Sequence, residues 1–559
     1  MATFTLRQGI DIAKKLEPTG ENQLLLLGRQ SAIKAAQNGT DWAKSVDAKL
    51  GTMVDEHILK RAMEKVEKSA GSVPLYMDLA KIAVVSDEIS RYNSPANGYG
   101  ITKEVAAIRV SKGVKCLNVV LFTDYDSVMA STVAIARCFP LFSAKSKKAG
   151  ANGNGPDEVQ VQVDLVLTDG KTLSESELDF LNTLCDSVRF AARLVEMPTN
   201  FLHTEALLDE ALSRVDAIGV PVEKTIIKGK ELVERGFGGI YSVGQAAAHP
   251  PIFACFSHKP QGATETYALV GKGIVYDTGG FSLKSRGNMA GMKVDMGGAA
   301  ALLAAFCTLV KANYGQNLHC LLCLAENSMK VDMGGAAALL AAFCTLVKAN
   351  YGQNLHCLLC LAENSVSPDA TRPDDIITML SGKTVEVNNT DAEGRIVLGD
   401  GVFYAKETLK ADTIIDMATL TGAQQYATGS HHAAILTNNQ QLEAECVQAG
   451  RKSGDLVHPL PYMPEFHFAD LSSKVADMKN SSLGGGVGPP SAVAGLFIGS
   501  HFLDMNKPMG SEGDPRWVHI DMASNVNSKL LGERASGFGT ALVCALLGQH
   551  TNVAELLTK

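Results

Sequence analysis

The sequence predicts an α/β protein in two parts, an N-terminal α/β domain and a C-terminal α/β domain with a mainly parallel sheet covered by helices. Apolar runs of strand length alternate with longer helix-like stretches along most of the chain. This alternation is typical of parallel sheets with helices packed on them. The chain also has 559 residues, more than one hydrophobic core usually holds, so at least two domains are expected.

Composition excludes several classes of protein. With 46% hydrophobic and 20% charged residues, the chain has the composition of an ordinary soluble globular protein. A net charge of −8 argues against nucleic acid or an anionic membrane as the main partner. The longest apolar run, Ala299 to Val310, is shorter than the roughly 20 residues of a membrane span. Met1 to Ile10 has no signal-peptide pattern and the 12 cysteines fit a reducing compartment, so we expect a cytoplasmic protein.

We assign residues 1–178 to the first domain, and we find no convergent chemical groups in it. A loop is expected over Lys145 to Pro156 because glycine, asparagine and proline gather there. A helix over Glu175 to Val195 leads into the second domain, residues 179–559. The elements expected in the first domain are strands over Gln23 to Leu27, Val105 to Val110, Leu117 to Phe122 and Val159 to Leu167, and helices over Met53 to Ser69 and Asp126 to Cys138.

Charged residues interrupt the first apolar strand of the second domain. Lys272 lies inside a run that otherwise reads as a buried parallel strand, and a buried lysine loses its proton readily, so it can serve as a neutral nitrogen ligand. Asp277 follows where this strand should end, and Gly279 and Gly280 allow a sharp turn there. Ligands of open α/β sheets gather at the carboxyl ends of strands. The strands expected in this domain are Tyr267 to Tyr276, Leu318 or Leu355 onward, Thr384 to Val387, Asp412 to Met417 and Trp517 to Asp521.

A second charged stretch, Asn388 to Arg395, follows the strand expected at Thr384 to Val387. Asp391 and Glu393 are two residues apart on a turn, so both can point at one place, and divalent cations offset the repulsion between them. The alternative is a polar turn that caps a helix over Ile396 to Leu409 and needs no metal. The upstream lysine and aspartate favour the metal site.

With Asn-Thr-Asp-Ala-Glu-Gly-Arg at 389–395, and with Lys272, Asp277 and Lys284, the chain resembles the leucyl (cytosol) aminopeptidase family. It is most similar to the animal aminopeptidase-like branch of that family. The resemblance covers roughly Ala191 to the C-terminus. It implies an exopeptidase that acts at the amino terminus of peptides and uses two metal ions.

The resemblance also implies which residues hold the metals. Two zinc ions are expected, with manganese or magnesium as the alternative at one site, and together they would bridge the hydroxide that attacks the scissile carbonyl. The substrate's free amine would bind a metal, which restricts cleavage to the N-terminal residue. One ion is assigned to Lys272, Asp277, Asp295 and Glu393, and the other to Asp277, Asp391 and Glu393.

Two further residues have implied catalytic roles. Lys284 would stabilise the developing oxyanion. Arg395 would hold a bicarbonate ion that acts as general base. By the same resemblance we expect a homohexamer that acts on peptides with a free N-terminus and binds neither nucleic acid nor membrane. The alternative function is that of a catalytically impaired family member acting as a binding or scaffold protein.

An exact repeat lies inside the second domain: residues 292–328 recur as residues 329–365, with all 37 residues identical. Two identical copies do not make a solenoid, which needs about three units with atypical ends, so the repeat indicates a recent exon duplication or an error in the gene model. The repeat duplicates a Cys-x-x-Cys pair, Cys320 with Cys323 and Cys357 with Cys360. Each pair lies in an expected strand, where residues three apart face opposite ways and cannot grip one zinc ion.

The repeat also leaves two candidates for one metal ligand. Asp295 stands 11 residues after Lys284, and Asp332 stands 59 residues before Asp391; each spacing is one that the family requires. The extra 37 residues are best tolerated in the polar turn Lys311 to Asn317, at the edge of the sheet away from the candidate site. That arrangement keeps Asp295 in the site and uses the strand of the second copy. We therefore favour Asp295, with its duplicate Asp332 as the alternative.

Overall fold

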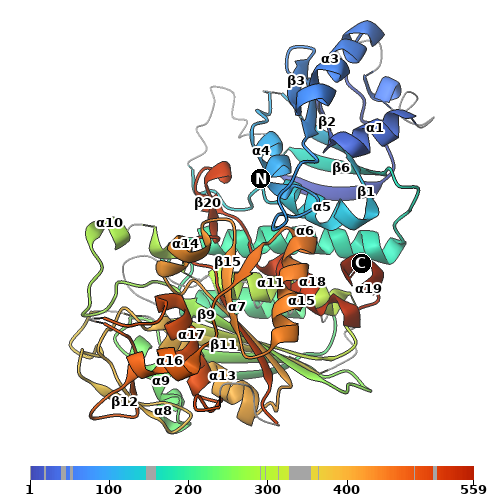
Figure 1. Ribbon diagram of the computed structural model, residues 1–559. Helices are drawn as coiled ribbons and strands as arrows, with labels where there is room; N and C mark the ends of the chain where they lie inside the picture. The colour runs from blue at the N-terminus through green and yellow to red at the C-terminus, as the bar shows by residue number, and fades with distance from the viewer. Residues whose placement is uncertain are drawn as a thin grey trace. The chain divides into compact units, whose positions relative to one another are not determined.

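The computed structural model describes residues 2–17, 20–38, 46–50, 54–111, 113–145, 159–289, 291–295, 297–312, 314–325, 354–362, 364, 366–483, 485–507 and 513–558 (Figure 1). The chain divides into two compact units. The first comprises residues 1–189, 451–454 and 559, and the second comprises residues 190–450 and 455–558. Asp332 and the apolar helix expected over Ala336 to Val347 lie outside the described residues.

The first unit contains a six-stranded sheet in the order β1-β6-β5-β2-β4-β3. Its neighbours are parallel except for β3, which pairs antiparallel with β4. Strand β5 is buried along its whole length, as is typical of the inner strands of parallel sheets. The strands are β1 (Thr3–Gln8), β2 (Asn22–Arg29), β3 (Gly71–Leu75), β4 (Ala80–Val85), β5 (Cys116–Thr123) and β6 (Gln160–Leu167). The helices are α1 (Gln30–Asn38), α3 (Glu56–Ser69), α4 (Gly98–Ala106), α5 (Val128–Ala136) and the start of α6 (Glu175–Glu196).

One predicted strand in this unit is wrong. Residues 105–110 were expected to be extended, but the first two belong to α4 and the rest form a loop. The helix begins where the side chain of Asn97 accepts a hydrogen bond from the backbone N–H of Gly100. Ile101 and Val105 then bury one face at helical spacing, which the short apolar run alone does not reveal.

The second unit contains a nine-stranded sheet, ordered β16-β15-β18-β14-β9-β10-β11-β8-β7. Its centre is parallel, because β9, β14 and β18 run side by side in the same direction. The strands are β7 (Glu223–Lys228), β8 (Ile252–His258), β9 (Thr266–Ile274), β10 (Asn317–Ala325), β11 (Asn354–Ala362), β14 (Thr413–Ala418), β15 (Ala433–Thr437), β16 (Val457–Pro459) and β18 (Arg516–Asp521). Strands β7 and β15 are antiparallel to their neighbours β8 and β18, so the predicted mainly parallel sheet is confirmed for the centre and modified toward the edges.

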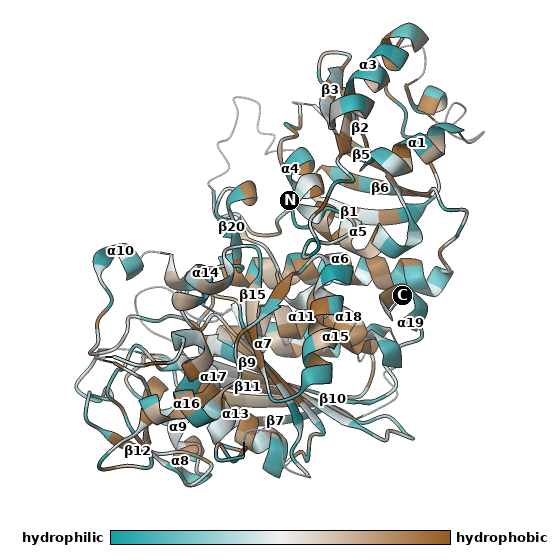
Figure 2. Cartoon of the chain, in the orientation of Figure 1, coloured by the Kyte–Doolittle hydropathy of each residue, from teal (hydrophilic) through white to brown (hydrophobic). Residues whose placement is uncertain are grey.

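Helices cover this sheet. Figure 2 shows α11 and α17 with little hydrophilic colour, in agreement with their buried side chains. Among the described residues, no helix is both long enough and apolar enough to cross a membrane. The main helices are α7 (Thr204–Asp216), α11 (Gly297–Lys311), α13 (Gly394–Glu407), α15 (Gln440–Ser453), α17 (Pro490–Ser500) and α18 (Thr540–Leu547). The shorter ones are α8 (Lys230–Glu234), α9 (Gly238–Gly244), α10 (Arg286–Met289), α14 (Ala423–Thr428), α16 (Pro464–His467) and α19 (Ala554–Thr558).

The strand expected over residues 384–387 forms, but not in the main sheet. It is β13 (Thr384–Glu386), which pairs with β12 (Ile376–Thr378) and β17 (Met478–Lys479) in a separate three-stranded sheet. The expectation that it joins the main sheet is wrong, because its backbone pairs with β12 and β17 instead. A further pair, β19 (Asn527–Ser528) and β20 (Arg534–Ala535), forms a short hairpin.

The two copies of the repeat contribute equivalent strands. Strands β10 and β11 each align antiparallel with β8 in the same register, so that Leu318 and Leu355 are both opposite His258. A strand has two edges, and β7 already pairs with one edge of β8. The two identical strands therefore compete for the one remaining edge of β8. Both Cys-x-x-Cys pairs lie in these strands, as predicted.

Candidate metal centre

The charged residues singled out in the second unit converge at the carboxyl end of β9. Lys272 lies within that strand, Asp277 follows it, and Asp295 lies two residues before α11. Asp391 and Glu393 stand in the turn before α13. Asp277, Asp295 and Glu393 are buried, and one carboxylate oxygen from each lies within 4.8 Å of the other two. Asp332 lies outside the described residues, so Asp295 is the copy that the structure describes here.

Lys272 is held among these carboxylates. Its Nζ donates to Asp295 and to the carbonyl of Thr419 at 3.2 Å, and it lies 3.1 Å from Oε1 of Glu393. Gly394 leaves the space for this side chain, because a Cβ at that position would lie 2.6 Å from Cε of Lys272. The glycine that follows Glu393 is therefore required by the packing of the lysine.

Lys284 lies between the other two carboxylates. Its Nζ is 2.6 Å from Oδ2 of Asp277 and also pairs with Asp391. The chain reaches this position through a turn at Gly279 and Gly280, which have φ angles of +84° and +59°. L-residues rarely adopt such angles, so glycine is needed at both positions.

The second copy of the repeat adds a residue that the sequence analysis missed. Asn364, just after β11, donates through Nδ2 to Oδ1 of Asp277 at 2.9 Å and to the carbonyl of Thr390 at 2.6 Å. Asp277 and Asn364 also form an isolated parallel bridge. The signal was present in the sequence, since Asn364 follows a strand whose carboxyl end lies at the same edge as Asp277.

Crowding of like charges perturbs the carboxylates. Burial, together with Asp277 and Glu393, raises the pKa of Asp295 to about 7. Burial and Asp277 raise the pKa of Asp391 to about 8. Burial alone would lower the pKa of Lys272, but Asp295, Glu393 and Asp277 outweigh it and raise that pKa. Lys272 is therefore an ammonium in the ion-free chain, and the neutral amine expected from the sequence requires a metal ion to displace the proton.

The donor set fits divalent cations. Oε2 of Glu393 is buried but has no hydrogen-bond partner in the part of the chain that the structure describes. A buried carboxylate oxygen without a partner is costly, and a metal ion would satisfy it. Four carboxylates beside two ammonium groups also leave an excess of negative charge.

Arg395 lies one residue inside α13. Burial lowers the pKa of its guanidinium to about 10, against the opposing effect of Glu393 and Asp521. Its Nε is buried and, within the described ranges, has no hydrogen-bond acceptor. The guanidinium is thus able to take one more acceptor, such as a small anion.

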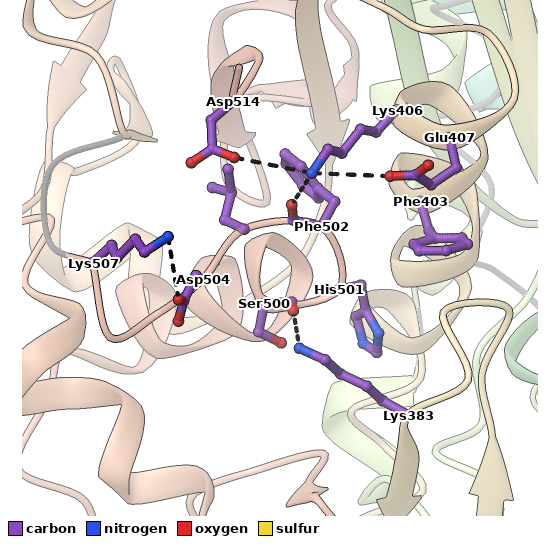
Figure 3. Close-up of a pocket in the computed structure, with 11 residues that line it drawn as sticks. Lys383, Phe403, Lys406, Glu407, Ser500, His501, Phe502, Asp504, Lys507 and Asp514 are labelled. Carbon is purple, nitrogen blue, oxygen red and sulfur yellow. Dashed lines mark hydrogen bonds and ion pairs between the residues drawn. The ribbon is translucent and has the colours of Figure 1, made fainter. Parts of the chain in front are cut away.

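One pocket, of about 400 Å³, lies at the other end of α13, around Lys406 (Figure 3). Its lysines are already used by backbone carbonyls: Lys406 donates to Phe502 at 2.8 Å, and Lys383 donates to Ser500 at the end of α17. Cations are favourable at a helix C-terminus. The lysines of this pocket therefore stabilise the C-terminal end of α17, and the pocket is separate from the carboxylate cluster.

Family models match most of the chain. The cytosol aminopeptidase family, catalytic domain, matches residues 189–330 and 327–544, and each of these two stretches includes one complete copy of the repeat. The M17 aminopeptidase N-terminal domain 2 matches residues 22–148.

Relatives and solved structures agree with these matches. The chain is 43% identical to leucine aminopeptidase 1 of Caenorhabditis elegans, over 96% of each chain. It is 44% identical to the human probable aminopeptidase NPEPL1, over 94% of this chain and 90% of that one. The structure of C. elegans leucine aminopeptidase superposes with a TM-score of 0.83 over 99% of this chain and 100% of that one, at 42% identity. A leucyl aminopeptidase from Trypanosoma brucei, in complex with bestatin, gives a TM-score of 0.77 at 31% identity over 98% of this chain and 96% of that one.

Proposed function

The chain belongs to the cytosol aminopeptidase family, and we propose that it removes single unblocked amino acids from the N-termini of peptides. The family is one of metal-dependent hydrolases, and the observation that carries the proposal is the buried carboxylate cluster at the carboxyl end of β9. The alternative, a catalytically impaired binding or scaffold protein, is not favoured, because every residue of the donor set is present.

Two divalent ions fit the cluster, and zinc is the proposed metal, with manganese or magnesium as the alternative at one position. When bound, such ions supply an activated water and polarise the peptide carbonyl. We assign one ion to Lys272, Asp277, Asp295 and Glu393, and the other to Asp277, Asp391 and Glu393. Asp277 and Glu393 thus belong to both sets. Both residues are almost fully buried, with 1% and 3% of their surface exposed, which supports their place at the centre of the cluster.

Two cationic side chains complete the proposed machinery. Lys284 has an ammonium fixed by Asp277 and Asp391, so it is ready to donate to the oxygen on which charge develops in the transition state. Arg395 is proposed to hold bicarbonate as general base. Its buried Nε, with no acceptor among the described residues, supports that assignment.

The proposed partners are peptides with a free N-terminus. A homohexamer and a cytoplasmic location are proposed as well; the location is supported by relatives that carry the name probable cytosol aminopeptidase.

The direct test compares leucine arylamide with N-acetyl-leucine arylamide as substrates of the purified full chain. We expect hydrolysis of the unblocked substrate alone, loss of activity on treatment with a chelator, and recovery on addition of zinc or manganese. Glu393→Gln is the matched inactive control. Cleavage of the acetylated substrate, or activity that resists chelation, would overturn the proposal.

A further inference from the structure

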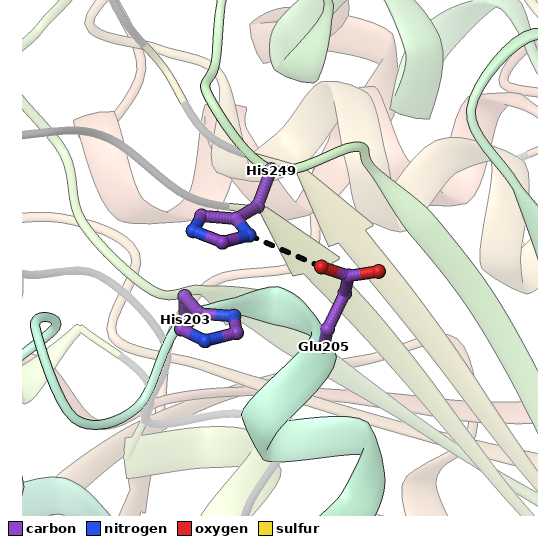
Figure 4. A group of neighbouring side chains, drawn as sticks. All are labelled: His203, Glu205 and His249. Atoms are coloured by element: carbon purple, nitrogen blue, oxygen red, sulfur yellow. Dashed lines mark hydrogen bonds and ion pairs between the residues drawn. The ribbon is translucent and has the colours of Figure 1, made fainter.

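A second group of potential metal ligands lies outside the carboxylate cluster. His203 and Glu205 stand at the start of α7, and His249 precedes β8 (Figure 4). One donor atom from each of the three lies within 4.8 Å of the other two. None of the three takes part in the proposed catalytic centre.

The spacing of two donors already approaches that of a metal site. Nδ1 of His249 lies 3.1 Å from Oε2 of Glu205. A tetrahedral zinc ion with bonds of about 2.0–2.1 Å keeps its donor atoms about 3.3–3.4 Å apart. An ion would therefore need only a small outward shift of this pair.

His203 requires a larger adjustment. Its ring stacks on that of His249, with centroids 3.8 Å apart and planes inclined by 10°. The lone pair of an imidazole nitrogen lies in the ring plane, so two parallel rings cannot both point at one ion, and one of them must turn. His203 is held at Nδ1 by a long hydrogen bond of 3.4 Å from the N–H of Ala206, so turning it costs one weak bond.

The chemistry of the group indicates which ion it would select. Two imidazoles and one carboxylate suit zinc and its transition-metal neighbours, whereas magnesium and calcium prefer all-oxygen sites. Burial and the neighbouring His249 lower the pKa of His203, which keeps the imidazole neutral. The side chains of His249 and Glu205 are 34% and 43% exposed, so an ion can reach them from solvent.

We propose that His203, Glu205 and His249 form an additional site for a zinc-class divalent ion, with solvent in the remaining coordination positions. An ion there would join the start of α7 to the segment before β8. The preceding loop is already tied to the end of β9, since Thr199 donates to the carbonyl of Val275 at 3.3 Å. Occupancy should therefore stabilise the segment that leads to Asp277.

The test titrates cobalt(II) into full-length Asp277→Asn/Glu393→Gln protein, in which the catalytic cluster is weakened. Beyond any cobalt that the weakened cluster still holds, we expect one equivalent to bind at the histidine site. It should show the strong visible absorption of a low-coordinate N/O site. His249→Ala and His203→Ala in this background should abolish that absorption. His57→Ala, which removes an exposed histidine from α3, should leave it unchanged.

Glu205→Gln separates a metal site from a purely structural contact. Glutamine can still accept a hydrogen bond from His249 but is a much poorer ligand, so zinc affinity should fall by at least about 10-fold while the melting temperature without metal changes little. In the otherwise wild-type chain, His249→Ala should reduce bound zinc from three ions to two and leave peptidase activity in place. Unchanged cobalt binding in both histidine variants would overturn the proposal, and so would a wild-type zinc content that stays at two.

Discussion

Both units bury a lysine against a carboxylate, but the two arrangements differ in how completely the charges are partnered. In the first unit, Lys49 is 0% exposed, and its ammonium donates to Oδ2 of Asp164 at 2.6 Å and to Asn118. Asp164 also accepts from the N–H of Asp11 at 2.8 Å and from Gln162 at 2.9 Å. This network is closed, since each of its charged groups has a protein partner.

In the second unit, Lys272 and Lys284 face four carboxylates, and one oxygen of Glu393 has no hydrogen-bond partner among the residues described. The pKa values of Asp295 and Asp391 are raised there to about 7 and about 8. Burial alone therefore does not mark a functional site in this protein. The functional site is marked by an excess of charge of one sign together with a buried polar atom that has no partner among the described residues.

The largest effect is expected from Glu393→Gln, which removes one negative charge from the crowded cluster. Both ions should bind more weakly, and kcat/KM should fall by at least about 10⁴-fold, equivalent to about 5.5 kcal/mol. The metal-free protein should be no less stable, because the substitution relieves repulsion. Metal content, arylamide hydrolysis and thermal unfolding measure the three quantities. Marked destabilisation of the metal-free form would show that this cluster is as closed as the one around Lys49.

A similarly large effect, on stability alone, is expected from Lys49→Met. Breaking a buried ion pair on one side leaves Asp164 unpaired and costs about 3–5 kcal/mol. Hydrogen exchange of the amides in β5 and β6 measures the loss within the first unit. Bound metal should not change, and the exposed Lys60→Met on α3 is the control. A cost below about 1 kcal/mol would contradict the closed network.

Lys284→Ala should have an intermediate effect. Removing one donor to a developing oxyanion typically lowers kcat by about 10²–10³-fold. Metal content should be retained, because Lys284 is not proposed as a ligand. Equal loss of metal from this variant and from Glu393→Gln would refute the separate roles of the two residues.

The smallest effect is expected at Asp332. Asp332→Asn should change neither metal content nor activity, whereas Asp295→Asn, in an identical local sequence, should lose one ion and the activity. Inactivation by Asp332→Asn instead would mean that the duplicated residues enter before the helix. Deletion of residues 329–365 should raise solubility, because the apolar helix expected in the second copy has no place in the core and would expose apolar surface.

How far the sequence predicts this molecule depends on how local each feature is. Lys272, Asp277 and the turn at Asp391 are readable because charge interrupts apolar runs within short stretches. The pair of Lys49 and Asp164 is not, because its partners are 115 residues apart and meet only through the order of the sheet. The contact between His249 and Glu205 cannot be predicted from the sequence for the same reason, because the two residues are 44 positions apart.

Element boundaries show the same limit. Strands β2, β5 and β6 follow from apolar runs long enough to cross a sheet. The run at residues 105–110 is short, and its first two residues belong instead to the helix that Asn97 caps. Strand β13 forms as expected, but which sheet it joins depends on β12 and β17, which carry no sequence signal of their own at two or three residues each.

The shared register of β10 and β11 on β8 affects how well this chain tolerates substitutions in either strand. A substitution that disables one strand leaves an identical strand that takes the same register on β8. The buried centre of this sheet should therefore tolerate mutations in 317–325 or 354–362 that a chain with a single copy would not survive. The metal centre combines the two copies, because Asp295 precedes the first copy of the helix and Asn364 follows the second copy of the strand.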